Sequence, residues 1–248
     1  MSLNDLMKQI NKRYGNDSFV QASKNKSLRR KQRIETGILA LDLAMGGGIP
    51  LGTILTLKGE FSSGKSALAH RIGGAFNRHC RNCGSPMQIW QESLQDGAYV
   101  ACCENPEPMK VVWLDAEASF QSEWAEMLGM RMDHTYVLRN QFAEQAIDAA
   151  DAILRSGECD LLVVDSVAAL TPSVEIEQSS EKWQVGVHAR LMNKAMRKFV
   201  SAQNAYEYGK KPPTIILINQ IRMKVGVFYG SPETSPGGKG IDFAASII

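Results

Sequence analysis

Uninterrupted apolar runs alternate with amphipathic stretches along most of this chain. Four runs of mainly aliphatic residues predict buried strands, and apolar residues at helical spacing predict three helices between them. The strands are predicted at 54–57, 111–114, 161–164 and 215–218, and the helices at about 64–78, 142–155 and 188–204. Aliphatic strands separated by helices are typical of a parallel sheet covered on both faces. We therefore predict an α/β fold with a mostly parallel central sheet flanked by helices.

The first 33 residues form a separate stretch, in which we expect a small helix and a basic linker. A helix is predicted because apolar residues recur at helical spacing and a glycine that can end the helix follows. These residues are Leu3, Leu6, Met7, Ile10 and Tyr14, followed by Gly15. A short amphipathic helix must cover its apolar stripe, either on a neighbouring molecule or on its own domain. Residues 24–33 carry six basic side chains and no acidic one, which is typical of a solvated linker and also suits attraction to DNA.

Residues 59–66 match the phosphate-binding pattern G-x-x-x-x-G-K-[ST]. The loop follows a predicted strand and opens a predicted helix, so backbone N–H groups and the helix N-terminus favour phosphates at one point. Lys65 would neutralise the β- and γ-phosphates of a nucleoside triphosphate, and the Ser66 hydroxyl would bind Mg²⁺. An ordinary glycine turn is the alternative, which the agreement of strand, loop and helix disfavours. The predicted nucleotide contacts are Gly59, Glu60, Phe61, Ser62, Ser63, Gly64, Lys65, Ser66 and Ala67.

Each of the other predicted strands ends near a polar side chain that could serve nucleotide chemistry. Asp165 follows the third strand and has the position of a carboxylate that holds Mg²⁺ together with Ser66. Glu117 lies just beyond the second strand and could deprotonate the water that attacks the γ-phosphate. Gln220 ends the fourth strand, where an amide could sense that phosphate. Taken singly, polar residues at strand ends often only start turns. With the phosphate loop, they predict a catalytic site that uses Lys65, Glu117 and Gln220.

Composition sets wide limits on function. The chain has 248 residues, of which 44% are hydrophobic and 22% charged, enough for one α/β domain with small additions. A net charge of +2 does not identify a partner, because nucleic-acid binders can concentrate basic side chains locally. No apolar run reaches membrane-spanning length and the N-terminus is polar. We therefore expect a soluble cytoplasmic protein that does not enter a membrane.

A cysteine-containing insertion at about 79–108 separates the first core helix from the next strand. Four of the five cysteines lie there, and a cytosolic chain uses such cysteines for metal or as free thiols before disulfides. A C-x-x-C-G turn and a second cysteine pair could complete a tetrahedral zinc site, with His79 as the alternative to one of the two adjacent cysteines. Free thiols are the alternative, and Cys159 is expected to be merely packed. The predicted zinc ligands are Cys80, Cys83, Cys102 and Cys103.

Four long motifs follow one another in the second half of the chain. They are Asp-Ser-Val-Ala-Ala-Leu-Thr-Pro at 165–172, Ala-Arg-Leu-Met-Asn-Lys-Ala-Met-Arg at 189–197, Ile-Asn-Gln-Ile-Arg-Met-Lys-Val-Gly at 218–226 and Pro-Glu-Thr-Ser-Pro-Gly-Gly at 232–238. Together they resemble the bacterial and phage RecA-type recombinases, from near residue 34 to the C-terminus with an interruption near Cys80. The resemblance implies a RecA-like P-loop ATPase core at 34–248 that uses ATP and Mg²⁺. It also implies a DNA-dependent ATPase that forms filaments on single-stranded DNA, searches double-stranded DNA and exchanges strands in recombinational repair.

The resemblance also implies roles that the residues alone leave open. Trp124 falls where the family has an aromatic residue that stacks on adenine, and a core tryptophan is the alternative. The segments 177–186 and 220–238 resemble the family's two DNA-binding loops, in which cations reach phosphates and short apolar side chains enter between bases. Without the resemblance, both would be solvated loops. The implied DNA contacts are Val185, Gly186, Arg190, Arg197, Arg222, Lys224, Val225, Gly237 and Gly238.

Self-association is implied as well, with the N-terminal helix and the region of Phe243 joining neighbouring protomers. Two features depart from the family's pattern. Asp242 stands where a lysine is expected, and the chain ends at Ile248, before the late lysines that reach ATP across the protomer interface. The alternative function is therefore a truncated or regulatory RecA paralogue that binds ATP and DNA without full strand exchange. A P-loop kinase of small molecules has little support, because no lid or acceptor site is evident.

Overall fold

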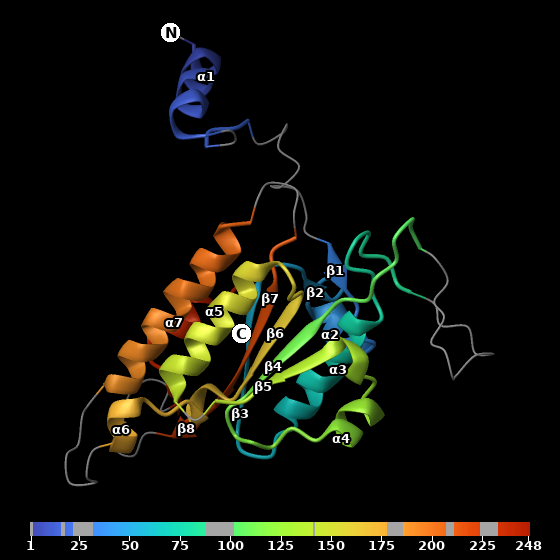
Figure 1. Cartoon of the computed structure of the whole chain (residues 1–248), viewed down its shortest axis with the longest axis vertical. Helices are drawn as coiled ribbons and strands as arrows, with labels where there is room; N and C mark the ends of the chain where they lie inside the picture. The colour runs from blue at the N-terminus through green and yellow to red at the C-terminus, as the bar shows by residue number, and fades with distance from the viewer. Residues whose placement is uncertain are drawn as a thin grey trace. The chain divides into compact units, whose positions relative to one another are not determined.

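The computed structural model describes residues 2–15, 18–21, 32–87, 102–140, 142–177, 186–206, 211–223 and 233–248. The chain divides into two compact units, Met1–Gln32 and Arg33–Ile248 (Figure 1). Within the described ranges, no helix combines the length and apolar character needed to cross a membrane.

The smaller unit contains the predicted N-terminal helix, α1, at Leu3–Tyr14. Ser2 caps the helix: its Oγ accepts the Asp5 N–H at 3.2 Å, while the Asp5 carboxylate accepts the Ser2 N–H at 3.1 Å. Gly15 ends the helix with a φ of 104°. No side chain of α1 is buried, so the apolar stripe that its sequence predicts is available for contact with another surface.

Five parallel strands form the central sheet of the larger unit (Figure 1). Their order is β3-β7-β6-β4-β5, and every neighbouring pair is parallel. The bounds are β3 Ile54–Gly59, β4 Val111–Asp115, β5 Thr135–Leu138, β6 Leu161–Asp165 and β7 Thr214–Gln220. The predicted parallel sheet and its four strands are confirmed. The apolar pattern does not predict β5, because this strand is short and its central Tyr136 and Val137 are exposed at the edge of the sheet.

Helices cover both faces of the sheet, as predicted. α5 and α7 pack on one face, against side chains that include Leu114, Val164 and Leu217. α3 packs on the other face, against side chains that include Trp113 and Val163. Successive residues of each strand therefore enter opposite cores, which explains why the strands are apolar throughout. The helix bounds are α3 Lys65–Asn77, α5 Ala143–Ser156 and α7 Val187–Asn204, each within one residue of its prediction.

Shorter elements complete the larger unit. They are β1 Arg33–Ile34, α2 Leu39–Ala44, β2 Ile49–Pro50, α4 Ser122–Met127, α6 Ser173–Glu177, β8 Arg222–Met223, β9 Glu233–Thr234 and α8 Lys239–Ala244, with 3-10 helices at Met132–His134 and Val167–Ala169. β1 pairs with β2, and β8 with β9, both antiparallel. Beyond α8, the Ile247 carbonyl accepts the Thr56 N–H at 2.9 Å. The segment after α8 therefore lies along the side of β3 that β7 leaves open.

Candidate functional site

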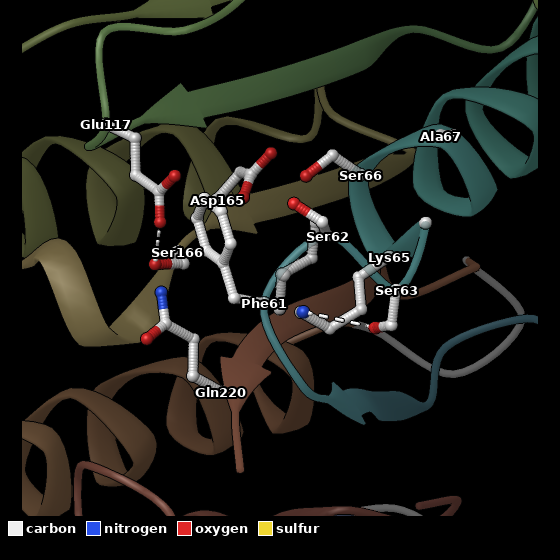
Figure 2. A pocket seen from close by; sticks show the side chains of 12 residues that line it. Phe61, Ser62, Ser63, Lys65, Ser66, Ala67, Glu117, Asp165, Ser166 and Gln220 are labelled. Carbon is white, nitrogen blue, oxygen red and sulfur yellow. Dashed lines mark hydrogen bonds between the residues drawn. The ribbon is translucent and has the colours of Figure 1, made fainter. Parts of the chain in front are cut away.

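A pocket of about 260 Å³ opens at the carboxyl ends of the central strands (Figure 2). The loop between β3 and α3 supplies one part of its wall, and residues at or just beyond the ends of β4, β6 and β7 supply the rest. Because parallel strands end at one edge of the sheet, side chains that are far apart in the sequence converge there. The lining residues are Phe61, Ser62, Ser63, Gly64, Lys65, Ser66, Ala67, Glu117, Asp165, Ser166, Ile218 and Gln220.

The phosphate loop owes its geometry to its glycines. Gly64 has a φ of 83°, a left-handed conformation that favours glycine, and α3 begins at Lys65. A Cβ on Gly59 would lie 2.5 Å from the Ser63 Oγ, so a side chain there would clash within the loop. The Lys65 Nζ donates to the Glu60 carbonyl at 2.5 Å and to the Ser63 Oγ at 3.3 Å. These bonds hold an ammonium group over the loop at the N-terminus of a helix, which suits a phosphate.

Asp165 is the buried carboxylate of the pocket. It ends β6, and only 3% of the residue is exposed. Burial raises the pKa of its carboxyl from 3.8 to about 6, while a hydrogen bond with Ser66 opposes the rise and the negative charge of Glu117 adds to it. Hydroxyl and carboxylate oxygens are ligands that Mg²⁺ accepts, and a cation would compensate the buried charge. Ser66 and Asp165 therefore fit the predicted metal.

The raised pKa of Asp165 makes stability depend on pH in a definite direction. The folded state binds this proton more tightly than the unfolded chain, so the free energy of unfolding falls as the pH rises from about 4 to about 6. A pKa shift of one unit corresponds to about 1.4 kcal/mol. The total decrease in the free energy of unfolding, complete once the pH is above 6, is therefore about 3 kcal/mol. We expect Asp165→Asn to raise the free energy of unfolding of the ligand-free protein by up to about 3 kcal/mol at pH 7, and progressively less toward pH 4. Urea denaturation at several pH values measures this.

Asp115 provides the matched control for Asp165→Asn. It is also a buried carboxylate, but its oxygens accept several hydrogen bonds. Its oxygens accept the N–H groups of Ser119 at 2.9 Å and Phe120 at 3.2 Å, and the Arg139 Nε at 3.0 Å. Asp115→Asn should therefore lower the free energy of unfolding at pH 7, because an amide weakens these bonds. Stabilisation by Asp115→Asn, or destabilisation by Asp165→Asn, would contradict this account of the two carboxylates. Asp115 anchors the turn after β4 and does not line the pocket.

Glu117 and Gln220 line the pocket as predicted. Glu117 lies two residues beyond β4, and Gln220 is the last residue of β7. The Ser166 Oγ donates a hydrogen bond to the Glu117 Oε1 at 2.5 Å and so fixes the direction of that carboxylate (Figure 2). Ser166 and Ile218 also line the pocket, although the sequence reasoning did not select them. The one signal for Ser166 is its place directly after the strand-ending aspartate.

Three predicted nucleotide contacts do not line the pocket. Gly59 and Glu60 directly precede the lining residues of the loop. Trp124 lies in α4 and is 45% exposed, which excludes the alternative of a core tryptophan. A role for Trp124 at adenine stays a prediction.

The predicted DNA contacts fall into three groups. Gly186, Arg190 and Arg197 are exposed, the glycine as N-cap of α7 and the arginines along that helix. Gly237 is buried and Gly238 partly buried, both with positive φ, and a Cβ on Gly237 would lie only 2.5 Å from a neighbouring side chain. Close packing therefore requires a glycine at 237, which the sequence reasoning did not indicate. Arg222 lies in β8, whereas Val185, Lys224 and Val225 lie outside the described residues.

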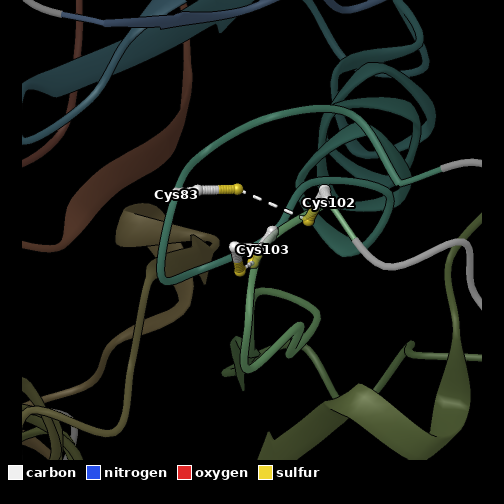
Figure 3. Close-up of side chains that lie close together, drawn as sticks. Cys83, Cys102 and Cys103 are labelled. Carbon is white, nitrogen blue, oxygen red and sulfur yellow. Dashed lines mark hydrogen bonds between the residues drawn. The ribbon is translucent and has the colours of Figure 1, made fainter.

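Four cysteine thiols meet in the insertion, as predicted. Figure 3 labels three of them, Cys83, Cys102 and Cys103. The four sulfurs all lie within 4.8 Å of one another, with 3.4 Å between Cys83 and Cys102 and 3.7 Å between Cys80 and Cys103. His79 is not a member of this group, and its Nδ1 donates to the Ala75 carbonyl at 2.8 Å. The geometry therefore favours the four cysteines over a set in which His79 replaces one of them.

The cluster provides unequal environments for its thiols. Burial alone would raise the pKa of Cys80, but hydrogen bonds from backbone N–H groups lower it to about 6. Desolvation and hydrogen bonds with neighbouring thiols raise the pKa of Cys102 to about 12. This environment therefore favours a thiolate at Cys80 and a protonated thiol at Cys102, and a cation among the sulfurs would favour the thiolate at both.

Arg81 attaches the cysteine cluster to the end of the sheet opposite the pocket. Its guanidinium lies 3.2 Å from Glu158 and 3.4 Å from Asp160, and it donates to the Gly157 carbonyl at 2.7 Å. Asp160 directly precedes β6, and its carboxylate also accepts the Lys110 N–H at 2.8 Å next to the start of β4. The cluster and the pocket are thus joined to opposite ends of the same strands.

The parallel sheet, the phosphate loop between β3 and α3, and the carboxylate at the end of β6 define a P-loop NTPase. A family model for the RecA N-terminal domain matches residues 1–102 and 98–248. Protein RecA of Sulfurimonas denitrificans is 40% identical over 248 residues, which cover 99% of this chain and 62% of that protein. Protein RecA of Nautilia profundicola is 38% identical over 243 residues, covering 97% of this chain and 60% of that protein. The chain therefore belongs to the RecA family, and it spans about three fifths of the length of these relatives.

Proposed function

We propose that this protein is an ATP-dependent DNA recombinase that assembles on single-stranded DNA, pairs it with double-stranded DNA and exchanges strands in recombinational repair in the cytoplasm. The observation that carries the proposal is the convergence of Lys65, Glu117, Asp165 and Gln220 in one pocket of a RecA-family fold. These residues suit hydrolysis of a nucleoside triphosphate. The family that the chain belongs to supports the coupling of this hydrolysis to DNA.

The pocket residues divide the chemistry of ATP hydrolysis among them. Lys65 would neutralise the phosphates, and the Glu117 carboxylate would accept a proton from the attacking water. The Ser166 hydroxyl keeps that carboxylate aimed into the pocket. Mg²⁺ held by Ser66 and Asp165 would supply further neutralisation of the charge that develops on the phosphates. Trp124, exposed on α4, would stack on adenine.

Gln220 would couple the identity of the bound nucleotide to DNA binding. It is the last residue of β7, and the segment 220–238 that resembles a DNA-binding loop starts there. Beside it, the Asn219 Nδ2 donates to the Pro236 carbonyl at 2.9 Å, so the two ends of this segment are held together. A hydrogen bond from Gln220 that is gained with ATP and lost with ADP would then favour one state of the segment. Exposed Arg190 and Arg197 would contact DNA phosphates without reading bases.

A second copy of this chain is the proposed partner for two apolar surfaces. One is the stripe of α1, and the other is Phe243, which is 86% exposed on α8. Next to it, Asp242 forms an ion pair with Lys58 at 2.5 Å. The acid that replaces the expected lysine is therefore neutralised within its own protomer and leaves Phe243 free to meet a neighbour.

Strand exchange separates this function from the alternative, a regulatory paralogue that binds ATP and DNA. The test incubates the protein with ATP, Mg²⁺, single-stranded DNA and a labelled homologous duplex, and follows release of the labelled strand. We expect release with the homologous duplex and none with a heterologous one. Binding of ATP and single-stranded DNA without any release would support the regulatory paralogue.

A structural Zn²⁺ is the proposed occupant of the cysteine cluster. Four thiolates around one point match the tetrahedral sulfur ligation that Zn²⁺ prefers. A metal would also favour the thiolate form of Cys102, because its positive charge offsets the desolvation and the neighbouring thiols that raise the pKa of this group. Free thiols are the competing state of the same cluster.

We expect the purified, reduced protein to contain about one equivalent of zinc, and Cys80→Ser with Cys83→Ser to lose it. ATP binding should persist, because the cluster is joined to the opposite end of the sheet from the pocket. Cys159→Ser, which changes a buried cysteine outside the cluster, is the control and should retain the metal. Absence of zinc together with four freely titrating thiols in the wild-type insertion would contradict the proposal.

A further inference from the structure

The turn directly after β6 contacts both the nucleotide pocket and the start of α7. Ser166 in this turn donates to Glu117, as described above. The next residue, Val167, is fully buried and begins a 3-10 helix. Its carbonyl lies 3.1 Å from the His188 Nε2, in the first turn of α7. Because a carbonyl only accepts hydrogen bonds, the Nε2 must carry the proton and donate it.

His188 holds the part of α7 that carries candidate DNA contacts. Gly186 is the N-cap of this helix and lies two residues before His188, and the exposed Arg190 lies two residues after it. A movement of the Val167 carbonyl would therefore be passed to the helix end at which these residues lie. The hydrogen bond from the His188 imidazole thus joins the turn after β6 directly to α7.

The same valine also borders the candidate DNA contact on the other segment. A Cβ built on Gly237 would lie 3.3 Å from the Val167 Cγ1 and 3.3 Å from the Met192 side chain of α7. Gly237 is buried and has a φ of 88°, and a Cβ there would lie only 2.5 Å from the Ile241 Cδ1. Val167 therefore borders Gly237 near the end of the segment 220–238, and it is hydrogen-bonded to His188 two residues beyond the end of the segment 177–186.

We infer that His188 is a positioning residue that links the state of the nucleotide pocket to DNA affinity, through the chain of contacts Glu117, Ser166, Val167 and His188. This inference rests on the proposed recombinase function, and it adds a second connection beside the one through Gln220. Movement of the Glu117 carboxylate when the γ-phosphate is bound or lost would shift Ser166 and the Val167 carbonyl, and His188 would carry the shift to α7. His188 itself is not among the residues that line the pocket.

Two substitutions of similar size isolate the hydrogen bond. His188→Met keeps a large side chain and removes the donor, whereas His188→Gln retains an N–H that can reach a carbonyl. The readouts are single-stranded DNA affinity, measured by fluorescence anisotropy with a non-hydrolysable ATP analogue and with ADP, and ATP turnover with and without that DNA. We expect His188→Met to reduce the ratio of the two DNA affinities about three- to tenfold, the change that one lost hydrogen bond produces. ATP turnover without DNA and nucleotide affinity should stay at wild-type values, and His188→Gln should restore the ratio.

The outcomes separate the inference from the function on which it rests. If wild-type DNA affinity does not depend on the nucleotide, the proposed function fails and the inference fails with it. If the wild type shows the dependence and His188→Met retains it in full, only the inference is overturned. An equal loss in His188→Met and His188→Gln would also overturn it, because the shape of the ring rather than its donor would then matter.

Discussion

Replacing Glu117 by glutamine is expected to lower ATP turnover about 10²- to 10⁴-fold while ATP affinity stays near that of the wild type. The amide keeps the size of the side chain and can still accept the hydrogen bond from Ser166, but it cannot take a proton from water. The arrested protein should remain on single-stranded DNA longer with ATP than the wild type does. Steady-state turnover, nucleotide titration and DNA dissociation measure the three effects.

Glu126→Gln is the matched control for this substitution. It makes the same chemical change in α4, at a residue that does not line the pocket, and should leave turnover unchanged. Wild-type turnover in Glu117→Gln would remove Glu117 from the hydrolytic step and leave the pocket without its proposed base.

Lys65→Ala is expected to reduce ATP turnover by about 10²- to 10³-fold, the cost of removing one donor that stabilises charge in a transition state. ATP affinity should fall as well, because Lys65 is the only cation among the described residues that line the pocket. The substitution also removes the two hydrogen bonds from Nζ to the Glu60 carbonyl and the Ser63 Oγ, whereas the loop keeps its glycines. Isothermal titration with ATP and a turnover assay give the two values.

Lys198→Ala controls for the loss of a lysine. Lys198 forms an ion pair with Asp148, neither residue lines the pocket, and exposed pairs of this kind contribute about 1 kcal/mol or less. Turnover should therefore be preserved. If Lys65→Ala hydrolysed ATP as fast as Lys198→Ala does, the assignment of the phosphate loop would be wrong.

The sheet was predictable from sequence where its strands are buried on both faces. The strands that became β3, β4, β6 and β7 have continuous apolar runs, because each supplies side chains to two cores. The apolar pattern did not predict β5, because an edge strand buries less of its surface and this one carries exposed Tyr136 and Val137. Its position was therefore set by pairing with β4 and not by its own pattern.

The sequence predicted most of the residues that lie at the site, but not the hydrogen bonds and burial of their side chains. Asp115 and Asp165 end neighbouring strands after similar apolar runs, and the sequence reasoning selected only Asp165 for nucleotide chemistry. What separates them is tertiary: Asp115 accepts two backbone N–H groups and Arg139, whereas Asp165 lies against Ser66 in the pocket. The hydrogen bond between His188 and Val167 joins residues that are 21 positions apart, and no sequence motif predicts it.

ATP turnover measured with Mg²⁺, with and without single-stranded DNA, tests the central claim most directly. The proposed function predicts turnover that single-stranded DNA stimulates and that Glu117→Gln lowers about 10²- to 10⁴-fold under both conditions. A stimulation that weakens with rising salt would fit contacts to phosphates. Turnover that is the same with and without single-stranded DNA would contradict the account, because the pocket would then hydrolyse ATP without any connection to DNA.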